Sequence, residues 1–408
     1  MKCTLQFPEG KLQGKVNLPS SKSISNRLLV IRALCKNDFL ISGLSGSDDT
    51  QALQQGLQSA SDIIDIGHAG TSMRFLTAYF AATGQQKTVT GSPRMKNRPI
   101  GDLADALNQI GADVVYTEQH GYPPVRTSGN PLSGKYIEIN GNVSSQFISA
   151  LLLIAPTLPE GLTIQIKGEP VSAPYIKMTL GLMLQAGVQA TWKNNAITVA
   201  RQDYRPEGMA VERDRSAASY WYQMAALSNE AELQLEGATE KSLQGDAIIA
   251  QMACVFGIKT EYTTEGALIT KNRNQCITLW LDFSDTPDLV QTMAVTCCLS
   301  NIRFRFTGLQ TLRLKETDRI AALQNELCKL GYCIEAKNTG VIEWNGERAE
   351  PQHPVCISTY NDHRMAMAFA PAAIHFPGLK IDDPDVVSKS YPNFWEDLKS
   401  VGATIVIL

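Results

Sequence analysis

The chain has 408 residues, of which 44% are hydrophobic and 19% are charged. This composition excludes a disordered protein, and the length exceeds what one hydrophobic core usually supports, so we expect two domains. The formal net charge of −3 excludes a general electrostatic attraction to nucleic acid or to an anionic membrane. Any anion must therefore be bound by local groups.

The cysteines and the first residues bear on the compartment. Nine cysteines occur without a CxxC pair, which fits neither a disulfide framework nor a zinc site. The first residues lack the apolar run of a signal peptide, and no stretch of about 18 apolar residues could cross a bilayer. We therefore expect a cytoplasmic protein with reduced thiols and no nucleic-acid or membrane partner.

Two helix patterns alternate along the chain. The first has a polar start and an apolar run rich in Ala, Leu and Met, which is typical of a helix buried on most sides. The second ends at a Gly that precedes a short strand, as expected of a glycine just after a helix C-terminus. The first pattern predicts helices at residues 20–34, 69–82, 143–155, 214–227, 286–299 and 361–374, and the second at 49–57, 103–111, 175–187, 246–257, 316–331 and 394–402.

Short strands with alternating apolar residues lie between these helices, for example at residues 136–139 and 303–307. This alternation indicates an internal repeat of one β/α unit in about six copies, three for each domain. No low-complexity linker separates the halves, so we place the crossings between domains after Pro19 and after Arg213. The predicted domains are residues 1–19 with 214–408, and residues 20–213.

The first candidate site for an anion lies at the start of helix 20–34. Ser21, Lys22 and Ser23 precede Arg27 there. Unpaired backbone N–H groups, hydroxyls and cations at a helix N-terminus suit a phosphate or a carboxylate. A serine helix cap with a solvated Lys and Arg explains the same segment equally well.

Two further segments carry weaker signals. Gly67 and Gly70 would let the backbone approach a ligand closely, although a tight turn also explains them. Residues 93–99 place three cations, including Arg94, between two prolines, and the prolines argue against a regular helix or a central strand. This segment is either a solvated charged loop or a clamp for an anion.

Two helix starts hold more polar groups than capping requires. Ser144, Ser145 and Gln146 open the most apolar helix, and capping needs only one of them. Ser172 and Tyr175 stand in the same way at the start of helix 175–187. Simple capping remains an alternative for both segments.

The segments 315–319 and 361–364 are denser in charge. Each is predicted to place cations and carboxylates in the first turn of an otherwise apolar helix. Cations at that end oppose the helix dipole by about 0.3–1 kcal/mol each, so a functional role explains them better than stability does. An ion-pair network between domains is the alternative. Asp288 is a carboxylate at one more helix start, where a plain helix cap is the alternative.

Together these segments resemble the EPSP synthase family along nearly the whole chain and in the family's order. LPSSKSISNR resembles the family's LPGSKSxSNR, GHAGTSMR resembles GNAGTAMR, and PRMKNRPI, SSQF, LRLKETDRI and YNDHRMAMAFA are similar to further family motifs. The resemblance implies an α/β fold of the inside-out α/β barrel kind, with two domains of three repeated β/α units each. It also implies that the domains close over a cleft into which helix N-termini point.

The resemblance further implies transfer of the enolpyruvyl group of phosphoenolpyruvate to the 5-hydroxyl of shikimate 3-phosphate, with no metal or cofactor. Asp288 would act on the ring hydroxyl and Glu316 on the C3 proton, while Lys315 would stabilise or relay charge; the division between Lys315 and Glu316 stays open. The residues implied for shikimate 3-phosphate are Lys22, Ser23, Arg27, Ser144, Ser145, Gln146, Ser172, Tyr175, Asp288 and Lys315, and those for phosphoenolpyruvate are Lys22, Gly70, Arg94, Gln146, Arg319, Arg364 and Lys389.

The chain departs from the family pattern in four places. His68 replaces the Asn of the NAGT motif, and Thr311 stands where an Asn is usual. Arg213 and Arg215 flank Asp214 in place of small residues. The stretch between residues 49 and 68 is short, so we expect a trimmed first repeat. None of these changes removes a catalytic group.

Three other functions compete with this interpretation. An enolpyruvyl transferase acting on UDP-N-acetylglucosamine would use a cysteine in the loop at residues 93–99, and this chain has none there. A non-catalytic phosphosugar-binding homologue would not need Asp288, Lys315 and Glu316. A phosphate-binding regulator of nucleic acid is opposed by the acidic charge balance.

We expect a monomer, and glyphosate sensitivity stays open because His68 and Phe75 neighbour Gly70.

Overall fold

The computed structural model describes residues 1–8, 10–272 and 276–408. Internal contacts divide the chain into two compact units. Unit 1 comprises Met1–Pro19 and Glu212–Leu408, and unit 2 comprises Ser20–Val211. The first strands of the chain therefore fold with its second half.

One chain motif recurs in both units: strand, helix, strand, helix and a closing pair of strands. The first two strands pair in parallel, and the closing pair adds two antiparallel strands beside the second one. Each copy thereby forms one four-stranded sheet, and the described residues contain five such sheets. The β/α repeat predicted from the alternating helix patterns is this motif.

Unit 2 contains two full copies and one reduced copy. The reduced copy has α1 and α2, and its strands β3 and β12 form only a two-stranded parallel sheet. Three copies were predicted for this half, the first of them trimmed, and the reduced copy is the first one of the unit. The elements are α1 (Lys22–Leu34), β3 (Ile41–Ser42), α2 (Asp48–Gln58), β4 (Ile63–Asp65), α3 (Gly70–Ala82), β5 (Thr88–Thr90), α4 (Pro93–Lys96), α5 (Gly101–Gln109), β6 (Val114–Tyr116), β7 (Val125–Thr127), β8 (Tyr136–Asn140), α6 (Ser145–Ile154), β9 (Leu162–Lys167), α7 (Ala173–Gln185), β10 (Ala190–Lys193), β11 (Ala196–Val199) and β12 (Met209–Ala210).

Unit 1 contains three full copies, and two of them borrow a strand from the N-terminus. Strand β2 pairs in parallel with β13, and β1 closes the sheet that contains β21 and β22. The elements are β1 (Lys2–Gln6), β2 (Lys11–Asn17), α8 (Arg215–Leu227), β13 (Glu230–Glu236), η2 (Gly245–Ile248), α9 (Ile249–Met252), η3 (Ala253–Phe256), β14 (Ile258–Thr263), β15 (Gly266–Lys271), β16 (Thr278–Asp282), η4 (Pro287–Leu289), α10 (Val290–Leu299), β17 (Arg303–Thr307), η5 (Gln310–Leu314), α11 (Arg319–Lys329), β18 (Glu335–Asn338), β19 (Val341–Trp344), β20 (Cys356–Ile357), α12 (His363–Phe369), η6 (Ala370–Ile374), β21 (Leu379–Asp382), η7 (Pro384–Lys389), α13 (Phe394–Ser400) and β22 (Thr404–Ile407).

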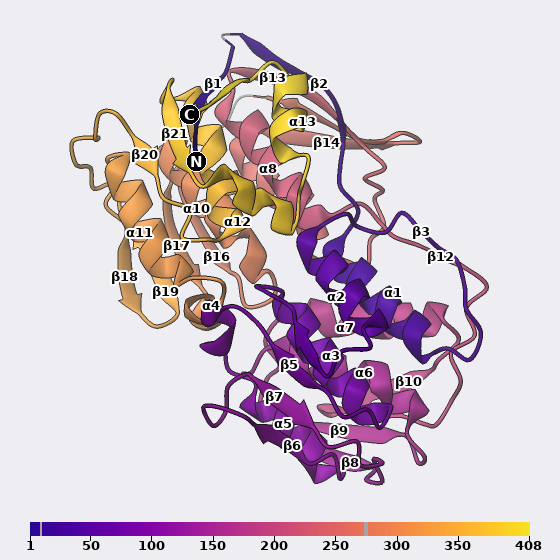
Figure 1. The fold of residues 1–408 in the computed structure, drawn as a ribbon. Coiled ribbons are helices and arrows are strands. Elements are labelled where there is room, and N and C mark those ends of the chain that lie inside the picture. The colour runs from indigo at the N-terminus through magenta and orange to yellow at the C-terminus, as the bar shows by residue number, and fades with distance from the viewer. Residues whose placement is uncertain (9, 273–275) are drawn as a thin grey trace. The chain divides into compact units, whose positions relative to one another are not determined.

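Apolar helices form the interior of each unit, and the sheets cover them. In unit 1, α8, α10 and α12 pack against one another (Figure 1), and every residue of α10 and α12 is buried. Strands such as β13 alternate between buried and exposed residues, so one sheet face contacts the helices and the other faces solvent. A helix that is apolar on all sides must be enclosed, which explains this inside-out arrangement.

One predicted helix is different in the structure. Residues 246–257 form three short helical segments, η2, α9 and η3, instead of one continuous helix. The segment contains Val255 and Phe256, which are weak helix formers, and it ends at Gly257 with a φ of 80°.

In the described residues, no helix has both the length and the apolar character needed to cross a bilayer.

Candidate active site

The start of α1 in unit 2 joins a lysine to a carboxylate. Ser21 caps the helix by accepting a hydrogen bond from the amide of Ile24 at 3.4 Å. Lys22 Nζ lies 2.9 Å from Oδ2 of Asp49 in α2, and both side chains are largely buried. Because this site also contains a negative charge, an incoming anion would compete with Asp49 for the ammonium group.

Arg27 links three helices of unit 2. Its side chain is 2% exposed, and its guanidinium donates to Thr179 Oγ1 at 2.7 Å and to Ser149 Oγ at 3.1 Å. It also donates to the carbonyls of Ser23 at 2.8 Å and of Tyr175 at 3.3 Å. Burial lowers the pKa of Arg27 to about 10, and these four partners are all neutral. The predicted ligands Ser23, Arg27 and Tyr175 therefore lie together.

The segment 93–99 contains a helical turn, so the prediction that its prolines exclude a regular helix was wrong. Pro93 is the first residue of α4, where a proline is tolerated, and Ser92 Oγ caps the turn by accepting from the amide of Met95 at 3.2 Å. Lys96 forms a surface ion pair with Glu118 at 2.6 Å. Lys96 is thus a surface cation, whereas Arg98 of the same segment is buried.

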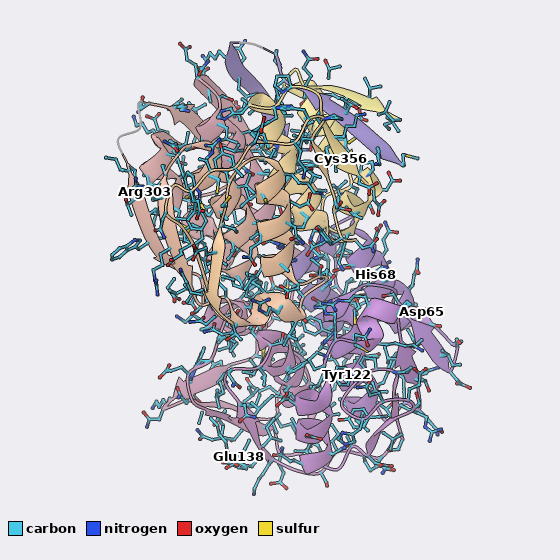
Figure 2. All side chains as sticks on the ribbon, turned by 90° about the vertical axis from the view of Figure 1, so that its left-hand side faces the viewer. Asp65, His68, Tyr122, Glu138, Arg303 and Cys356 are labelled. Carbon is cyan, nitrogen blue, oxygen red and sulfur yellow. The ribbon has the colours of Figure 1, made fainter. Side chains whose placement is uncertain are left out.

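Arg98, the third cation, is buried against the start of α3. A Cβ atom added at Gly70 would lie 2.5 Å from Nη1 of Arg98, so the guanidinium keeps this position only beside a glycine. His68 Nδ1 lies 2.9 Å from Ser92 Oγ, which joins the turn before α3 to α4; Figure 2 labels His68 in this turn and Asp65 at the end of β4. Sequence reasoning missed Arg98, because its position beside Gly70 depends on tertiary packing.

The start of α6 connects to the start of α3. Ser144 caps α6 by accepting from the amide of Gln146 at 3.4 Å, and Gln146 Nε2 donates to Thr71 Oγ1 at 3.2 Å. Ser145 is 7% exposed. Ser172 stands just before α7 with a left-handed φ of 55°, and its side chain makes no capping hydrogen bond. Capping therefore explains Ser144 but does not explain Ser172.

In unit 1, Arg319 is the centre of a cluster of charges. Its Nε donates to Asp362 Oδ2 at 2.8 Å, its Nη1 to Asp288 Oδ1 at 3.0 Å, and its Nη2 to Glu316 Oε2 at 3.0 Å. The Arg319 side chain is only 2% exposed. Burial alone would lower the pKa of Arg319, but these three carboxylates, Asp362 foremost, raise the pKa instead.

Asp288 is held between two guanidinium groups. Besides Arg319, Arg364 Nη2 donates to Asp288 Oδ2 at 2.6 Å, and Arg364 Nη1 donates to Tyr220 Oη at 3.3 Å. Burial alone would raise the pKa of Asp288, but the charges of Arg364, Lys315 and Arg319 outweigh it and keep the pKa well below its usual range. Asp288 is thus an ionised acceptor, located in η4 ahead of α10.

Glu316 completes the cluster with a second cation. Its Oε1 lies 3.2 Å from Lys389 Nζ, and both side chains are largely buried. The prediction that Lys315 and Glu316 occupy a first helical turn was wrong, because Asp318 caps α11 and both residues precede it. Asp362 likewise precedes α12 as its cap. The unit 1 cluster brings together all six predicted residues: Asp288, Lys315, Glu316, Arg319, Arg364 and Lys389.

Sequence reasoning missed a buried carboxyl beside this cluster. Asp246 is 4% exposed, and its Oδ2 accepts a hydrogen bond from the hydroxyl of Ser216, whereas its Oδ1 is buried without a hydrogen-bond partner. Burial, followed by the charge of Asp288, raises the pKa of Asp246 to about 7. Asp362 and Tyr220 were also missed as members of the cluster.

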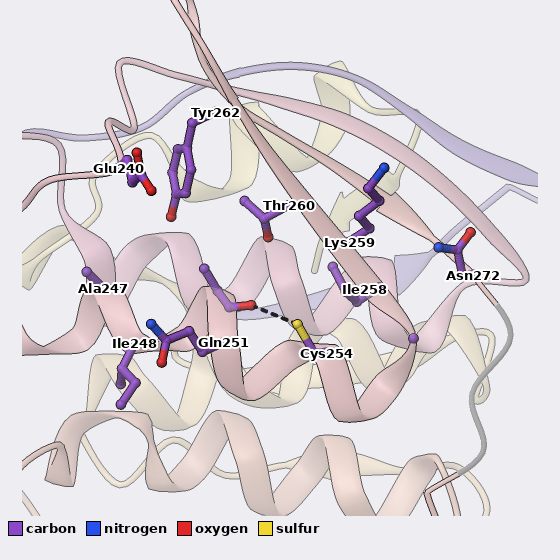
Figure 3. A pocket seen from close by; sticks show the side chains of 12 residues that line it. Glu240, Ala247, Ile248, Gln251, Cys254, Ile258, Lys259, Thr260, Tyr262 and Asn272 are labelled. Atoms are coloured by element: carbon purple, nitrogen blue, oxygen red, sulfur yellow. Dashed lines mark hydrogen bonds between the residues drawn. The ribbon is translucent and has the colours of Figure 1, made fainter.

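A separate pocket of unit 1 has a volume of about 780 Å³. Figure 3 shows residues of β14, including Thr260 and Tyr262, on one side and Gln251 and Cys254 of the short helical segments on the other. None of the residues predicted to bind substrate lines this pocket. The candidate site therefore remains the one formed by the predicted residues, and this pocket is not part of it.

Comparisons with known proteins agree with the sequence motifs. A family model described as EPSP synthase (3-phosphoshikimate 1-carboxyvinyltransferase) matches residues 7–60 and 53–398. A 3-phosphoshikimate 1-carboxyvinyltransferase of Bacteroides fragilis is 50% identical over 408 residues, which covers 100% of this chain and 99% of the relative. The chain belongs to the EPSP synthase family. A second relative with the same name, from Photobacterium profundum, is 36% identical and covers 97% of each chain.

Solved structures confirm the predicted fold. EPSP synthase from Acinetobacter baumannii matches with a TM-score of 0.78 at 20% identity, covering 100% of both chains. The enolpyruvyl transferase NikO from Streptomyces tendae matches with a TM-score of 0.74 at 14% identity, covering 99% of this chain and 98% of that one. These two likenesses establish the fold that the EPSP synthase family and NikO share, an α/β architecture of two halves.

Proposed function

We propose that this chain transfers the enolpyruvyl group of phosphoenolpyruvate to the 5-hydroxyl of shikimate 3-phosphate, which gives EPSP and inorganic phosphate. The observation that carries the proposal is the full-length, 50% identical relative named for this reaction. The charge cluster around Arg319 supports it, because an enzyme of two anionic substrates needs cations as well as an acid and a base.

The two units would supply different groups. For shikimate 3-phosphate we propose residues of unit 2, where hydroxyls and Arg27 gather at helix starts, together with Asp288 and Lys315 of unit 1. For phosphoenolpyruvate we propose the five cations Lys22, Arg94, Arg319, Arg364 and Lys389 together with Gly70 and Gln146. Two phosphates and two carboxylates carry about five to six negative charges at neutral pH, which cations of this number can balance.

The reaction requires one proton to be removed and one to be added. The 5-hydroxyl loses its proton to Asp288 as its oxygen bonds to C2 of phosphoenolpyruvate, and C3 gains a proton from Glu316, with Lys315 stabilising or relaying charge. In the resulting tetrahedral intermediate, C3 then returns a proton to Glu316 as the C2–O bond to phosphate breaks, and the departing phosphate takes the proton that Asp288 had accepted. The new enol ether and inorganic phosphate are the products.

The ion pairs of the cluster suggest how Asp288 becomes a base. Its pKa is low because Arg364 and Arg319 contact both carboxylate oxygens. A bound carboxylate or phosphate would compete with Asp288 for these two guanidiniums, and every contact that Asp288 loses raises its pKa. Phosphoenolpyruvate binding would therefore increase the basicity of Asp288 just when the hydroxyl must be deprotonated.

We also propose that the enzyme acts in the cytoplasm as a monomer. Nine cysteines that form no disulfide in the described chain are consistent with a reducing compartment. All the groups proposed for binding and catalysis belong to one chain, so no second copy is needed to complete them. Light scattering after size-exclusion chromatography would test the monomer, and a dimer would reject it.

The experiment that tests the function measures phosphate release with both substrates present. We expect release only when shikimate 3-phosphate and phosphoenolpyruvate are supplied together, and mass spectrometry should find EPSP in equal amount. Replacing shikimate 3-phosphate by UDP-N-acetylglucosamine is the control for the related reaction. Phosphate release with phosphoenolpyruvate and UDP-N-acetylglucosamine, but not with phosphoenolpyruvate and shikimate 3-phosphate, would reject the proposal. Binding of phosphoenolpyruvate and shikimate 3-phosphate without phosphate release would also reject it.

A further inference from the structure

A buried carboxylate outside the charge cluster connects α11 to the turn before α12. Glu326 lies in α11, and its side chain is 0% exposed. Its Oε1 accepts a hydrogen bond from the hydroxyl of Tyr360 at 2.7 Å, and its Oε2 accepts one from the amide of Ser358 at 2.9 Å. A buried carboxylate needs partners for its charge, and Glu326 takes two of them from this one turn.

Lys329 supplies the compensating charge from one helical turn further on. Its Nζ lies 2.7 Å from Oε2 of Glu326 and also donates to the carbonyl of Cys356, in β20, at 3.1 Å. Glu326 and Lys329 together therefore hold the chain from Cys356, the first residue of β20, as far as Tyr360.

The segment held in this way has a strained backbone. Tyr360 and Asn361 are consecutive non-glycine residues, and each has a left-handed φ of 55°. Such a conformation persists only where the surrounding structure holds it in place. The amide of Asp362 donates to the carbonyl of Thr359 at 2.9 Å, which closes the turn.

The residue that follows the strained pair is Asp362, which orients two cations of the cluster. One carboxylate oxygen accepts from Nε of Arg319 at 2.8 Å, and the other accepts from the backbone amide of Arg364 at 2.9 Å. The guanidinium of Arg364 in turn contacts Asp288 at 2.6 Å. A shift of the turn would therefore move both guanidiniums.

We infer that Glu326 is a positioning residue for phosphoenolpyruvate. It holds Ser358 and Tyr360, they fix the left-handed turn, and the turn places Asp362 so that Arg319 and Arg364 can bind an anion. This inference rests on the proposed function, in which those two arginines bind phosphoenolpyruvate. Glu326 itself contacts neither the charge cluster nor, in this mechanism, the substrate.

The test removes the hydroxyl of Tyr360 in the full-length chain. Tyr360→Phe should raise the KM for phosphoenolpyruvate by about tenfold, because misplacing a binding group by a fraction of an ångström has effects of this size. The dissociation constant of shikimate 3-phosphate should change less than about twofold, since the arginines moved by the turn are not among its proposed ligands. Glu326→Gln, which retains an acceptor for Tyr360, should be less impaired than Glu326→Ala.

Hydrogen–deuterium exchange gives a readout that needs no activity. Peptides covering residues 356–366 should exchange faster in Tyr360→Phe and in Glu326→Ala than in the wild type, while the rest of unit 1 remains unchanged. The matched control is Glu396→Gln, which breaks the exposed pair that Glu396 forms with Lys399 at the same i, i+3 spacing. This control should match the wild type in both KM and exchange.

The possible results distinguish a failure of the positioning role of Glu326 from a failure of the proposed function. An unchanged KM and unchanged exchange in Tyr360→Phe, with an active wild type, would overturn the positioning role. Equal losses of phosphoenolpyruvate and shikimate 3-phosphate affinity, with faster exchange throughout unit 1, would also overturn it in favour of a general structural role. A wild type that releases no phosphate would reject the proposed function, and exchange would then still show whether Glu326 holds the turn.

Discussion

Asp362 and Arg319 form a buried ion pair in which Oδ2 of the carboxylate lies 2.8 Å from Nε of the guanidinium. The two side chains are 0% and 2% exposed. Because water reaches neither group, removing the carboxylate leaves a buried charge without its main partner. The energetic consequence should be much larger than for an ion pair on the surface.

We therefore expect Asp362→Ala to lower the free energy of unfolding by about 3–5 kcal/mol. Urea denaturation followed by circular dichroism would measure it. Glu396→Ala is the matched control, because Glu396 and Lys399 form an exposed ion pair whose loss should cost less than about 1 kcal/mol. Equal effects of the two substitutions would contradict the importance assigned to the buried pair.

Asp288→Asn should reduce kcat by about 10²- to 10⁴-fold, which is the usual contribution of a general base. Asparagine retains the shape of the side chain and can still accept one hydrogen bond from Arg319 or Arg364, so folding should be preserved. Isothermal titration should find shikimate 3-phosphate binding largely intact. If turnover and binding fall by the same factor, Asp288 is not the base.

Arg94→Ala should weaken phosphoenolpyruvate binding by about ten- to a hundredfold, because a charge-assisted contact contributes about 1.5–3 kcal/mol. The control comes from the same short helix α4. Lys96→Ala removes a cation that pairs with Glu118 on the surface, and it should leave the KM unchanged. An unaltered KM in Arg94→Ala would place Arg94 outside the binding site.

Gly70→Ala should raise the KM for phosphoenolpyruvate by about tenfold, equivalent to about 1.4 kcal/mol. The added Cβ would lie 2.5 Å from Arg98 Nη1, so the guanidinium must move and disturb the start of α3. Gly46→Ala is the control, because nothing lies within 4 Å of a Cβ built there. Similar kinetics for the two variants would show that Arg98 adapts without consequence.

Asp246 should make the folded state less stable as the pH rises. Its pKa is raised to about 7 in the folded chain, above the ordinary value of 3.8, so the folded state retains a proton that the unfolded state releases between these values. The contribution of Asp246 to the free energy of unfolding is therefore fully present below about pH 4 and is lost as the pH rises to about 7.

Asp246→Asn removes this titration while keeping an acceptor for Ser216. Relative to the wild type, the variant should gain about 1–3 kcal/mol of stability between about pH 4 and pH 8. Urea denaturation at a series of pH values would measure the difference. A difference that does not vary with pH would show that Asp246 does not titrate in this range.

The sequence allowed much of the fold to be predicted, because the apolar helices are distinguished by local composition. The helix predicted at residues 69–82 is α3 (Gly70–Ala82), and the one at 214–227 is α8 (Arg215–Leu227). Both helices are buried along almost their whole length, as expected of helices rich in apolar residues. The first residue of a helix was harder to predict where several neighbouring residues could cap it. Asp318 begins α11, so Lys315 and Glu316 lie outside the helix.

The partners of the candidate site residues could not be read from the sequence. Asp362 and Arg319 are 43 residues apart along the chain, and a lone Asp before a helix reads as an ordinary cap. Asp362 does cap α12, and it binds Arg319 as well. Arg98 likewise reads as one cation of a charged segment until tertiary packing places it beside Gly70.

The pairing of β2 with β13 has a consequence for biosynthesis. The ribosome synthesises β1 and β2 before unit 2, but their partner strands follow only after all of unit 2 has been made. Residues 20–211 are continuous and can fold as they emerge, whereas the first nineteen residues must wait for the second half of the chain. Nascent chains arrested before β13 should therefore keep their N-terminal strands accessible to protease.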